Sequence, residues 1–190
     1  MSRVLLVGGS LRQGSYNQAL LHHLATYLPA QTTVQTLQPA SVALPLFNQD
    51  IERMPAHLQA AAQIHAQFSQ AEGLLVAVPE YNGQVTAYFK NLIDWMSRLP
   101  YVSDDFSNAF LDKPVLLCSA STGHTGGALG IQSARQLLAY VGGSVLGGAI
   151  CVSHVQQKFN GQAWTMSAEL SEMVAFHMQR FNRVLGAVRH

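Results

Sequence analysis

The sequence has few charged residues and no concentration of charge of one sign. Only 11% of its 190 residues are Asp, Glu, Lys or Arg, and the formal net charge is +1. Nucleic-acid binding is disfavoured, because no cluster of Lys and Arg could neutralise a run of phosphates. No apolar run approaches the roughly 20 residues of a membrane-spanning helix, and the N-terminus reads as a strand rather than a signal peptide. We therefore expect a cytoplasmic protein with no nucleic-acid or membrane partner.

Cysteine is also scarce, and histidine shows no metal-binding spacing. Cys118 and Cys151 both fall in apolar runs that predict strands, without a CxxC pair, so we interpret them as buried free thiols. The eight histidines are scattered, and the adjacent His22 and His23 would point to different sides of a helix. His124 lies in a candidate site loop, where a solvated side chain is the simpler interpretation. No metal site is expected.

The apolar content of 48% is high for so few charges. A chain of this length is long enough for one domain with a substantial core. No repeat or linker composition divides the sequence, so we predict a single domain over residues 1–190. A core-rich composition is consistent with a well-packed monomer and with an oligomer that hides part of its surface.

Apolar runs alternate with helix-period patterns along the whole chain. Alternation of this kind predicts parallel strands joined by right-handed helical crossovers, and so a five-stranded parallel sheet between two helical layers. The partly polar Thr33–Leu37 run is expected at a sheet edge. The expected strands are Arg3–Gly8, Thr33–Leu37, Gly73–Val78, Pro114–Ser119 and Val145–Val152, and the expected helices span Asn17–Pro29, Ala56–Glu72, Phe89–Arg98, Ile131–Val141 and Met166–Val188.

The stretch Gly73–Arg98 changes its period twice. A continuous apolar run ends at Pro79, which cannot donate to a sheet ladder, and a turn-prone loop over residues 80–83 follows. A helix with one apolar stripe comes next. Its polar side is expected to hold two ion pairs four residues apart, Lys90–Asp94 and Asp94–Arg98. The stripe consists of Phe89, Leu92, Ile93 and Met96.

A glycine-rich loop, GGSLRQGSYN, joins the first strand to the first helix. A helix N-terminus in this position presents free backbone N–H groups and the positive end of the helix dipole, which favour a phosphate. Ser10, Ser15 and Asn17 add neutral donors, and Arg12 adds a charged fork. An anion site is the economical interpretation, and a helix cap without a ligand is the alternative.

Two well-known phosphate-binding motifs do not fit this loop. The dinucleotide fingerprint GxGxxG fails because Ser10, Leu11 and Gln13 stand where glycines are required. Gly9 and Gly14 have the spacing of a nucleoside triphosphate P-loop, but Ser15 and Tyr16 replace its Lys and Ser/Thr. The anion is therefore expected to be neither a dinucleotide held in this way nor a triphosphate.

A third loop, ASTGHTGG, follows the fourth predicted strand. In an open α/β sheet, ligands bind beyond the carboxyl ends of the strands, so this loop, the loop after Pro79 and the first loop are expected at one edge. Glycines here allow close approach of the backbone to a flat ring, although they are equally consistent with a turn before a helix. The candidate residues are Ser121, Thr122 and Gly123.

Several segments resemble one family in the same order. PEYNG followed by FKNLIDW, and GSLRQGSYN with the pattern GSxRxxSxN, closely resemble the NAD(P)H-dependent FMN reductases, which have the flavodoxin-like fold. ASTGHTGG is similar to that family's S-x-G-x-x-GG loop, and LPLFNQD to its LPLYN segment. KFNG resembles its KFD segment, with Asn160 in place of Asp. The resemblance covers nearly the whole chain.

The resemblance implies a three-layer sandwich with strand order 2-1-3-4-5 and FMN as the cofactor. It implies that the flavin carries the chemistry without a catalytic acid or nucleophile from the protein. By this analogy the phosphate lies at the first loop and the isoalloxazine ring at the other two. The implied FMN-binding residues are Ser10, Arg12, Ser15, Tyr16, Asn17, Pro79, Glu80, Tyr81, Asn82, Gly83, Ser121, Thr122 and Gly123.

The implied reaction is ping-pong hydride transfer from NADPH or NADH through flavin N5 to a small acceptor such as a quinone, azo dye, nitroaromatic or chromate. A homodimer or homotetramer is expected by the same analogy, with the Phe89–Arg98 helix as a contact. Residues 85–88, VTAY, depart from the family pattern, so nucleotide preference and acceptor scope stay open, as does the role of Leu99–Asp112. The alternatives are a flavodoxin-like electron carrier, for which the sequence lacks an acidic run, and a flavin-free regulatory module.

Overall fold

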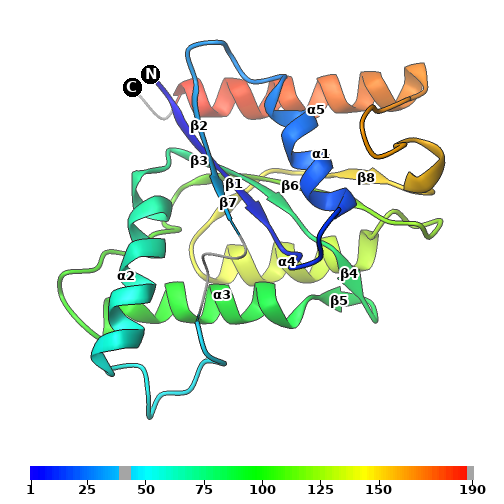
Figure 1. The fold of residues 1–190 in the computed structure, drawn as a ribbon. Coiled ribbons are helices and arrows are strands. Elements are labelled where there is room, and N and C mark those ends of the chain that lie inside the picture. Colours follow the sequence, from blue (N-terminus) through cyan, green and yellow to red (C-terminus); the bar gives the residue numbers. More distant parts are fainter. Residues whose placement is uncertain (39–43, 188–190) are drawn as a thin grey trace.

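The structure, a computed structural model, describes residues 1–38 and 44–187. Its main sheet has the order β2-β1-β3-β6-β7, with β8 also pairing with β6, and all of these pairs are parallel (Figure 1). This confirms the predicted flavodoxin-like order 2-1-3-4-5, with the last position shared by two short strands. The strands are β1 (Arg3–Gly8), β2 (Thr33–Leu37), β3 (Gly73–Ala77), β6 (Pro114–Ala120), β7 (Ser144–Val145) and β8 (Ile150–Val152).

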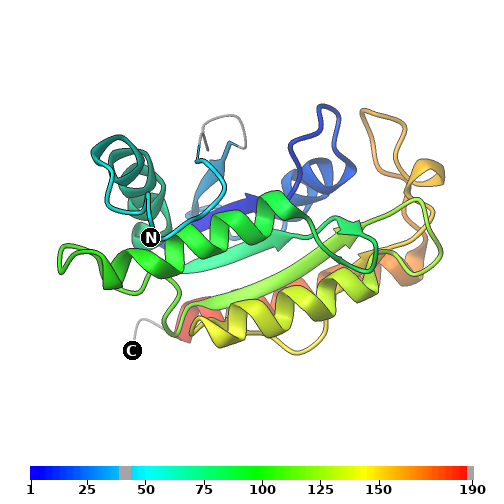
Figure 2. The same ribbon diagram turned by 90° about the horizontal axis from the view of Figure 1, so that it is seen from below.

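Helices cover both faces of this sheet. One face is covered by α1 (Tyr16–Ala25) and α5 (Ala168–Ala187), and the other by α2 (Pro55–Gln70), α3 (Ala87–Arg98) and α4 (Ala128–Tyr140) (Figures 1 and 2). Each layer has its own apolar core against the sheet. Strands β3 and β6 are buried along their whole length, as expected for parallel strands covered on both sides. None of the described helices is long and apolar enough to cross a membrane.

The expected strand Val145–Val152 was wrong as a continuous element. It is split into β7, which pairs with the start of β6, and β8, which pairs with its end. Gly148 between them has φ +81, a conformation that does not continue a strand. Arg135 of α4 donates to the carbonyl groups of Leu146 and Gly148 at 2.6 and 2.7 Å, which satisfies the backbone where the ladder is interrupted.

The helix boundaries differ from the predicted ones chiefly in α1. This helix ends at Ala25 rather than near Pro29, because Thr26 turns back onto His23 O through both its N–H and its hydroxyl, the latter at 2.7 Å. Helix α2 begins at Pro55, whose missing N–H is harmless in a first turn. The final helix is confirmed over Ala168–Ala187, and the last residues of its predicted range lie outside the described part of the chain.

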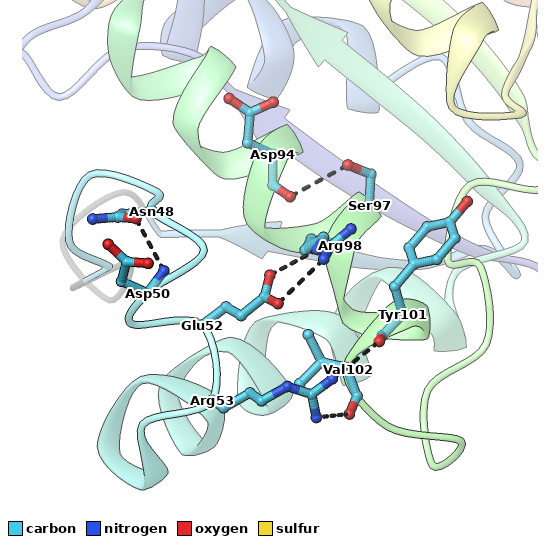
Figure 3. Close-up of polar contacts among 9 residues, drawn as sticks. All are labelled: Asn48, Asp50, Glu52, Arg53, Asp94, Ser97, Arg98, Tyr101 and Val102. Atoms are coloured by element: carbon cyan, nitrogen blue, oxygen red, sulfur yellow. Dashed lines mark hydrogen bonds and ion pairs between the residues drawn. The ribbon is translucent and has the colours of Figure 1, made fainter.

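The predicted ion pair between Asp94 and Arg98 was wrong. Lys90 does pair with Asp94, at 2.6 Å. Arg98 instead donates to both carboxylate oxygens of Glu52, at 2.7 and 3.2 Å, while Asp94 points elsewhere (Figure 3). Glu52 lies in the loop before α2 and is almost fully buried. Arg98 therefore makes a bidentate contact with a carboxylate far away in the sequence instead of an exposed ion pair within its own helix.

The loop before Glu52 is held by the same helix. Asn91 and Trp95 of α3 donate to Pro45 O at 3.0 and 2.8 Å, and Asn91 accepts from Phe47 N at 2.7 Å. The FKNLIDW and LPLFNQD segments therefore pack against each other. Pro39, which precedes this segment in the sequence, lies outside the described residues. The segment after α3 begins with a 3-10 turn over Leu99–Tyr101.

A small antiparallel hairpin, unforeseen in the sequence reading, follows β3. Its strands are β4 (Glu80–Tyr81) and β5 (Gln84–Val85), with Tyr81 opposite Gln84. The two residues between them, Asn82 and Gly83, have φ values of 53 and 73. Both angles are positive, as in the tight two-residue turn that Asn-Gly favours. The Asn-Gly dipeptide was therefore a signal for this hairpin.

Candidate functional site

The three loops singled out in the sequence leave the carboxyl edge of neighbouring strands β1, β3 and β6. They are also joined directly to one another. Thr86, after the hairpin, donates from its hydroxyl to Gly9 O in the first loop at 2.6 Å. Asn17 in the first loop exchanges two hydrogen bonds with Ala120 at the start of the third, at 2.9 and 3.0 Å. The loops therefore form one continuous rim at one end of the molecule (Figure 2).

The first loop leads into α1, whose start is only partly capped by the chain itself. Ser15 is the N-cap, and its hydroxyl accepts from Gln18 N at 3.4 Å. Within the described chain, the backbone N–H groups of Tyr16 and Asn17 have no acceptor. These donors and the helix dipole suit an anion. Ser10 Oγ accepts from Arg12 N at 3.2 Å, which gives the loop a defined turn.

Arg12 supplies the positive charge of this loop. Its side chain is exposed, lies 5.2 Å from the centre of the Tyr16 ring, and has no carboxylate partner among residues 1–38 and 44–187. Tyr16 in turn packs edge-on against Phe159, with ring centres 6.3 Å apart. The aromatic contact holds the guanidinium at the mouth of the loop. Arg12 Nη1 donates to Gln13 O at 3.4 Å, and the other N–H groups of the guanidinium can donate to a ligand.

A cleft of about 840 Å³ opens at this loop. Its described lining includes the whole segment from Ser10 to Tyr16 and, on the opposite side, Phe159, Asn160 and Gly161. No Asp or Glu lines it, whereas Arg12 and His22 do. The absence of a carboxylate among the lining residues, the open helix start and the guanidinium suit a phosphorylated ligand, so the residues present fit the phosphate of FMN.

Asn17 has a different position from the other candidates in the first loop. It is 5% exposed, and both ends of its amide are occupied by the backbone of Ala120. It therefore ties the first loop to β6. Ser121, which follows Ala120, donates its N–H to Val152 O at 3.0 Å, and its own carbonyl accepts from Val155 N at 3.1 Å. These bonds fix the third loop against the segment that carries Phe159.

Pro79 is buried, and Glu80 is half-buried. Pro79 is buried against the first loop, where a Cβ added to Gly9 would lie 2.9 Å from Pro79 Cδ. Glu80 accepts from Gly130 N of α4 at 2.9 Å. The carboxylate of Glu80 is thus bound by the first turn of α4, so this residue links β4 to α4.

The remaining candidates form the exposed part of the rim. The side chain of Tyr81 is 57% exposed, and Asn82 forms the tip of the hairpin with Gly83. Thr122 and Gly123 are exposed in the third loop, where Gly123 N donates to Ser121 Oγ at 3.1 Å. Polar backbone and an exposed aromatic ring at this edge are suited to a flat, partly polar ligand.

Several residues that shape the site were missed by the sequence reading. Thr86 caps α3 and joins the hairpin to the first loop. Gly126 and Gly127 have φ values of 64 and 87, and Gly126 lies so close to β8 that an added Cβ would be 3.0 Å from Ser153 N. A Thr before a helix stripe and a GG pair before a helix were the available signals. The approach of residues 159–161 to the first loop was not predicted, although the KFNG segment had been noted for its resemblance to the family.

Tyr88, one of the residues that departs from the family pattern, sits in the first turn of α3. Its hydroxyl oxygen is buried and has no hydrogen-bond partner among the described residues. Burial raises the pKa of Tyr88 to about 12. The hydroxyl therefore stays protonated at neutral pH. The two cysteines are free, with Cys118 buried and Cys151 half-buried, and burial raises the pKa of both thiols.

Comparison with known proteins gives consistent matches. The family model of the NADPH-dependent FMN reductases matches residues 2–158. A quinone reductase of Escherichia coli K12 is 35% identical over 147 residues, 76% of this chain and 73% of that protein. An NAD(P)H-dependent FMN reductase of Pseudomonas aeruginosa is 30% identical over 178 residues, 93% of this chain and 91% of that protein.

Solved structures agree on the fold. The flavoenzyme NAD(P)H:acceptor oxidoreductase FerB from Paracoccus denitrificans superposes with a TM-score of 0.81 at 23% identity, covering 98% of each chain. An oxidoreductase from Corynebacterium diphtheriae has a TM-score of 0.76 at 16% identity, also over 98% of each chain. The resemblance inferred from the loops is thereby confirmed: the chain is an oxidoreductase that belongs to the NADPH-dependent FMN reductase family.

Proposed function

We propose that the protein is an NAD(P)H:quinone reductase that uses bound FMN. The observation that carries this proposal is the continuous rim formed by the three loops. One end of the rim has the N–H groups of Tyr16 and Asn17, which have no acceptor among the described residues, and a guanidinium without a described carboxylate partner; the other end has an exposed aromatic residue, Tyr81. A phosphorylated planar cofactor requires both ends in one site. The quinone reductases among its relatives support a quinone as the acceptor, and azo, nitro and chromate acceptors extend the same proposal.

In this proposal the first loop holds the FMN phosphate. The N–H groups of Tyr16 and Asn17 and the hydroxyl of Ser10 would donate to phosphate oxygens, and Arg12 would neutralise their charge. Asn17 contributes only its backbone, because its side chain is occupied by Ala120. The N-cap contact of Ser15 keeps the helix start open toward the cleft.

The hairpin and the third loop would hold the ring. Asn82 and Gly83 present their backbone at the hairpin tip, and Ser121–Gly123 present theirs beside it. Backbone N–H groups directed at the polar edge of the ring would stabilise negative charge that develops there. Bound FMN supplies hydride acceptance from NADPH or NADH and onward transfer to the acceptor, in a ping-pong cycle. The protein residues orient the ring and leave one face open.

The experiment is an absorption spectrum of purified protein, followed by anaerobic addition of NADPH or NADH and then of a benzoquinone. Bound flavin that is bleached by the nucleotide and restored by the quinone supports the reductase. Flavin that stays oxidised with both nucleotides would contradict it and would favour an electron carrier instead. Protein that does not take up added FMN would contradict the cofactor assignment altogether.

Homodimer or homotetramer formation stays a prediction. The apolar stripe of α3 is not available for it, because Phe89, Leu92, Ile93 and Met96 are buried in the chain's own core. Only the polar side of this helix, with Lys90 and Asp94, can reach a second copy. Light scattering of the FMN-loaded protein measures the state directly, and a single mass near 20.6 kDa would contradict the expectation.

A further inference from the structure

The β4–β5 hairpin is fastened to α4 through both of its strands. In β4, Glu80 accepts from Gly130 N at 2.9 Å. In β5, Gln84 Oε1 accepts from Ser133 Oγ at 2.7 Å. Gly130 and Ser133 are three residues apart and so lie on the same side of α4. The hairpin therefore lies along the first two turns of this helix.

Helix α4 is short of a cap of its own. Its N-cap residue is Gly127, which has no side chain and makes no capping hydrogen bond. Gly130 is the third residue of the helix, and its N–H is one of the groups that a capping side chain normally satisfies. Glu80 provides that acceptor from a different element, and its negative charge lies at the positive end of the helix dipole.

Gly130 and Glu80 are packed so closely that a side chain at position 130 would contact Glu80. A Cβ added to Gly130 would lie 3.1, 3.3 and 3.4 Å from Cβ, Cα and Cγ of Glu80. Gly130 is buried, and glycine is the residue that lets β4 approach the helix so closely. Two contacts thus set the position of the hairpin relative to α4. One is the hydrogen bond from Gly130 N to the Glu80 carboxylate, and the other is the close packing of Glu80 against the backbone of Gly130.

We infer that Glu80 is a positioning residue, which holds the hairpin on α4 and thereby sets the place of Tyr81, Asn82 and Gly83 in the ring site. This inference rests on the proposed function. The contact that carries this role is the one between Glu80 Oε2 and Gly130 N of α4. Of the thirteen residues that the family resemblance implied as FMN-binding, Glu80 acts through its neighbours.

The test measures the FMN dissociation constant of flavin-stripped protein by quenching of FMN fluorescence. Glu80→Ala removes the acceptor and the charge, and we expect FMN to bind about tenfold more weakly, in line with loss of a charge-assisted hydrogen bond. Glu80→Gln keeps an oxygen that can accept from Gly130 N, and should restore most of the affinity. Ser133→Ala cuts the second tie at an exposed position and should weaken FMN binding in the same direction, by less.

The matched control is Lys113→Met, which removes a helix-capping charge at the opposite edge of the sheet. It should lower the melting temperature without changing FMN affinity. If Glu80→Ala lowers the melting temperature in the same way and leaves the FMN dissociation constant unchanged, Glu80 only caps α4 and the inference is wrong. If Glu80→Ala does not fold, Ser133→Ala decides, and FMN affinity equal to that of the parent in this variant overturns the inference.

Failure of this inference is distinct from failure of the proposed function. Parent protein that binds no FMN removes the proposed function before any variant is compared. Parent protein that binds FMN, beside a Glu80→Ala variant that binds it equally well, removes only the positioning role. The visible spectrum of bound flavin gives a second readout, since a displaced hairpin changes the polarity around the ring, whereas a purely structural cap leaves the absorption bands in place.

Discussion

The end of α2, at the amino edge of the main sheet, and the start of α1, at its carboxyl edge, differ in how their backbone groups are paired. At the amino edge, Lys113 Nζ donates to the carbonyl groups of Phe68, Ser69 and Ala71 at 2.9, 3.1 and 2.6 Å and so satisfies the end of α2. At the carboxyl edge, the first N–H groups of α1 at Tyr16 and Asn17 have no acceptor in the described part of the chain. Backbone groups are paired where the chain needs stability and are left open where a ligand is expected.

The carboxyl edge also carries several residues in the left-handed backbone region. Asn82, Gly83, Gly126 and Gly127 all have positive φ there, as does Gly14 in the first loop. Tight turns at this edge bring the backbone of three loops close to one another. The comparison therefore predicts that substitutions at the amino edge change stability, whereas those at the carboxyl edge change stability or ligand binding according to what each residue contacts.

The largest expected effect is that of Gly126→Ala. The new Cβ would require φ +64 of an L-residue and would lie 3.0 to 3.1 Å from backbone atoms of Ser153, Cys151 and Val152. We expect a loss of about 3 kcal/mol in the free energy of unfolding, measured by urea denaturation. Gly14→Ala is the control, because φ is also +64 but nothing lies within 4 Å, so it should cost about 1 kcal/mol. Equal losses would contradict a role for the close contact with β8.

At the amino edge, Lys113→Met should cost about 2 kcal/mol, because three carbonyl groups lose a charged donor while the apolar stem is kept. For a chain of this length the melting temperature should fall by roughly 4–8 °C. FMN affinity should stay at the parent value. A variant with unchanged melting temperature would remove the contrast between the two edges.

Arg12→Ala should have the converse effect. Its guanidinium has no carboxylate partner among the described residues, so the melting temperature of the flavin-free protein should not change, whereas FMN should bind about tenfold more weakly. Arg183→Ala, which removes the same charge from the exposed surface of α5, is the control and should leave binding intact. Unchanged FMN affinity in Arg12→Ala would remove this side chain from the phosphate site.

The smallest expected effect is the pH dependence of the stability difference between the parent and Glu52→Gln. Glu52 lies close to the end of α3 at the amino edge. Its hydrogen bonds from Arg98 lower the pKa of Glu52 despite the opposing effect of burial. Because the folded-state pKa is lower than the unfolded one, the contribution to stability is present above the ordinary pKa of Glu and is lost as pH falls through the lowered value. The melting-temperature difference between the parent and Glu52→Gln should therefore shrink as pH is lowered from about 6 to about 3. A constant difference would contradict the ion pair.

Much of the fold was readable because its signals are local. The buried runs of β3 and β6 and the stripe of α3 were each predicted from a few adjacent residues, and all were confirmed. The split between β7 and β8 and the β4–β5 hairpin were missed although Gly148 and the Asn82-Gly83 pair were visible in the sequence. Those two predictions were based on apolar content, whereas the conformations of the turn residues Gly148, Asn82 and Gly83 determine where the strands end.

Partners far apart in the chain could not be foreseen in this way. Arg98 had Asp94 four residues away, yet it binds Glu52, because a nearly buried carboxylate gains more from a two-toothed contact than an exposed one does. Glu80 and Asn17 were expected at the ligand, yet their side chains bind Gly130 and Ala120. Residue type alone does not tell a ligand-binding polar side chain from one that joins two loops.

By itself, the sequence determined the alternation of strands and helices, the edge of the sheet at which the three loops emerge, and the family to which they belong, because periodicity and turn residues act over a few positions. Only the tertiary structure decided which polar groups at that edge can bind a ligand and which are hydrogen-bonded to neighbouring elements of the protein. Hydrogen-bonding capacity is finite, and its division between protein and ligand depends on distances that arise only when the loops meet.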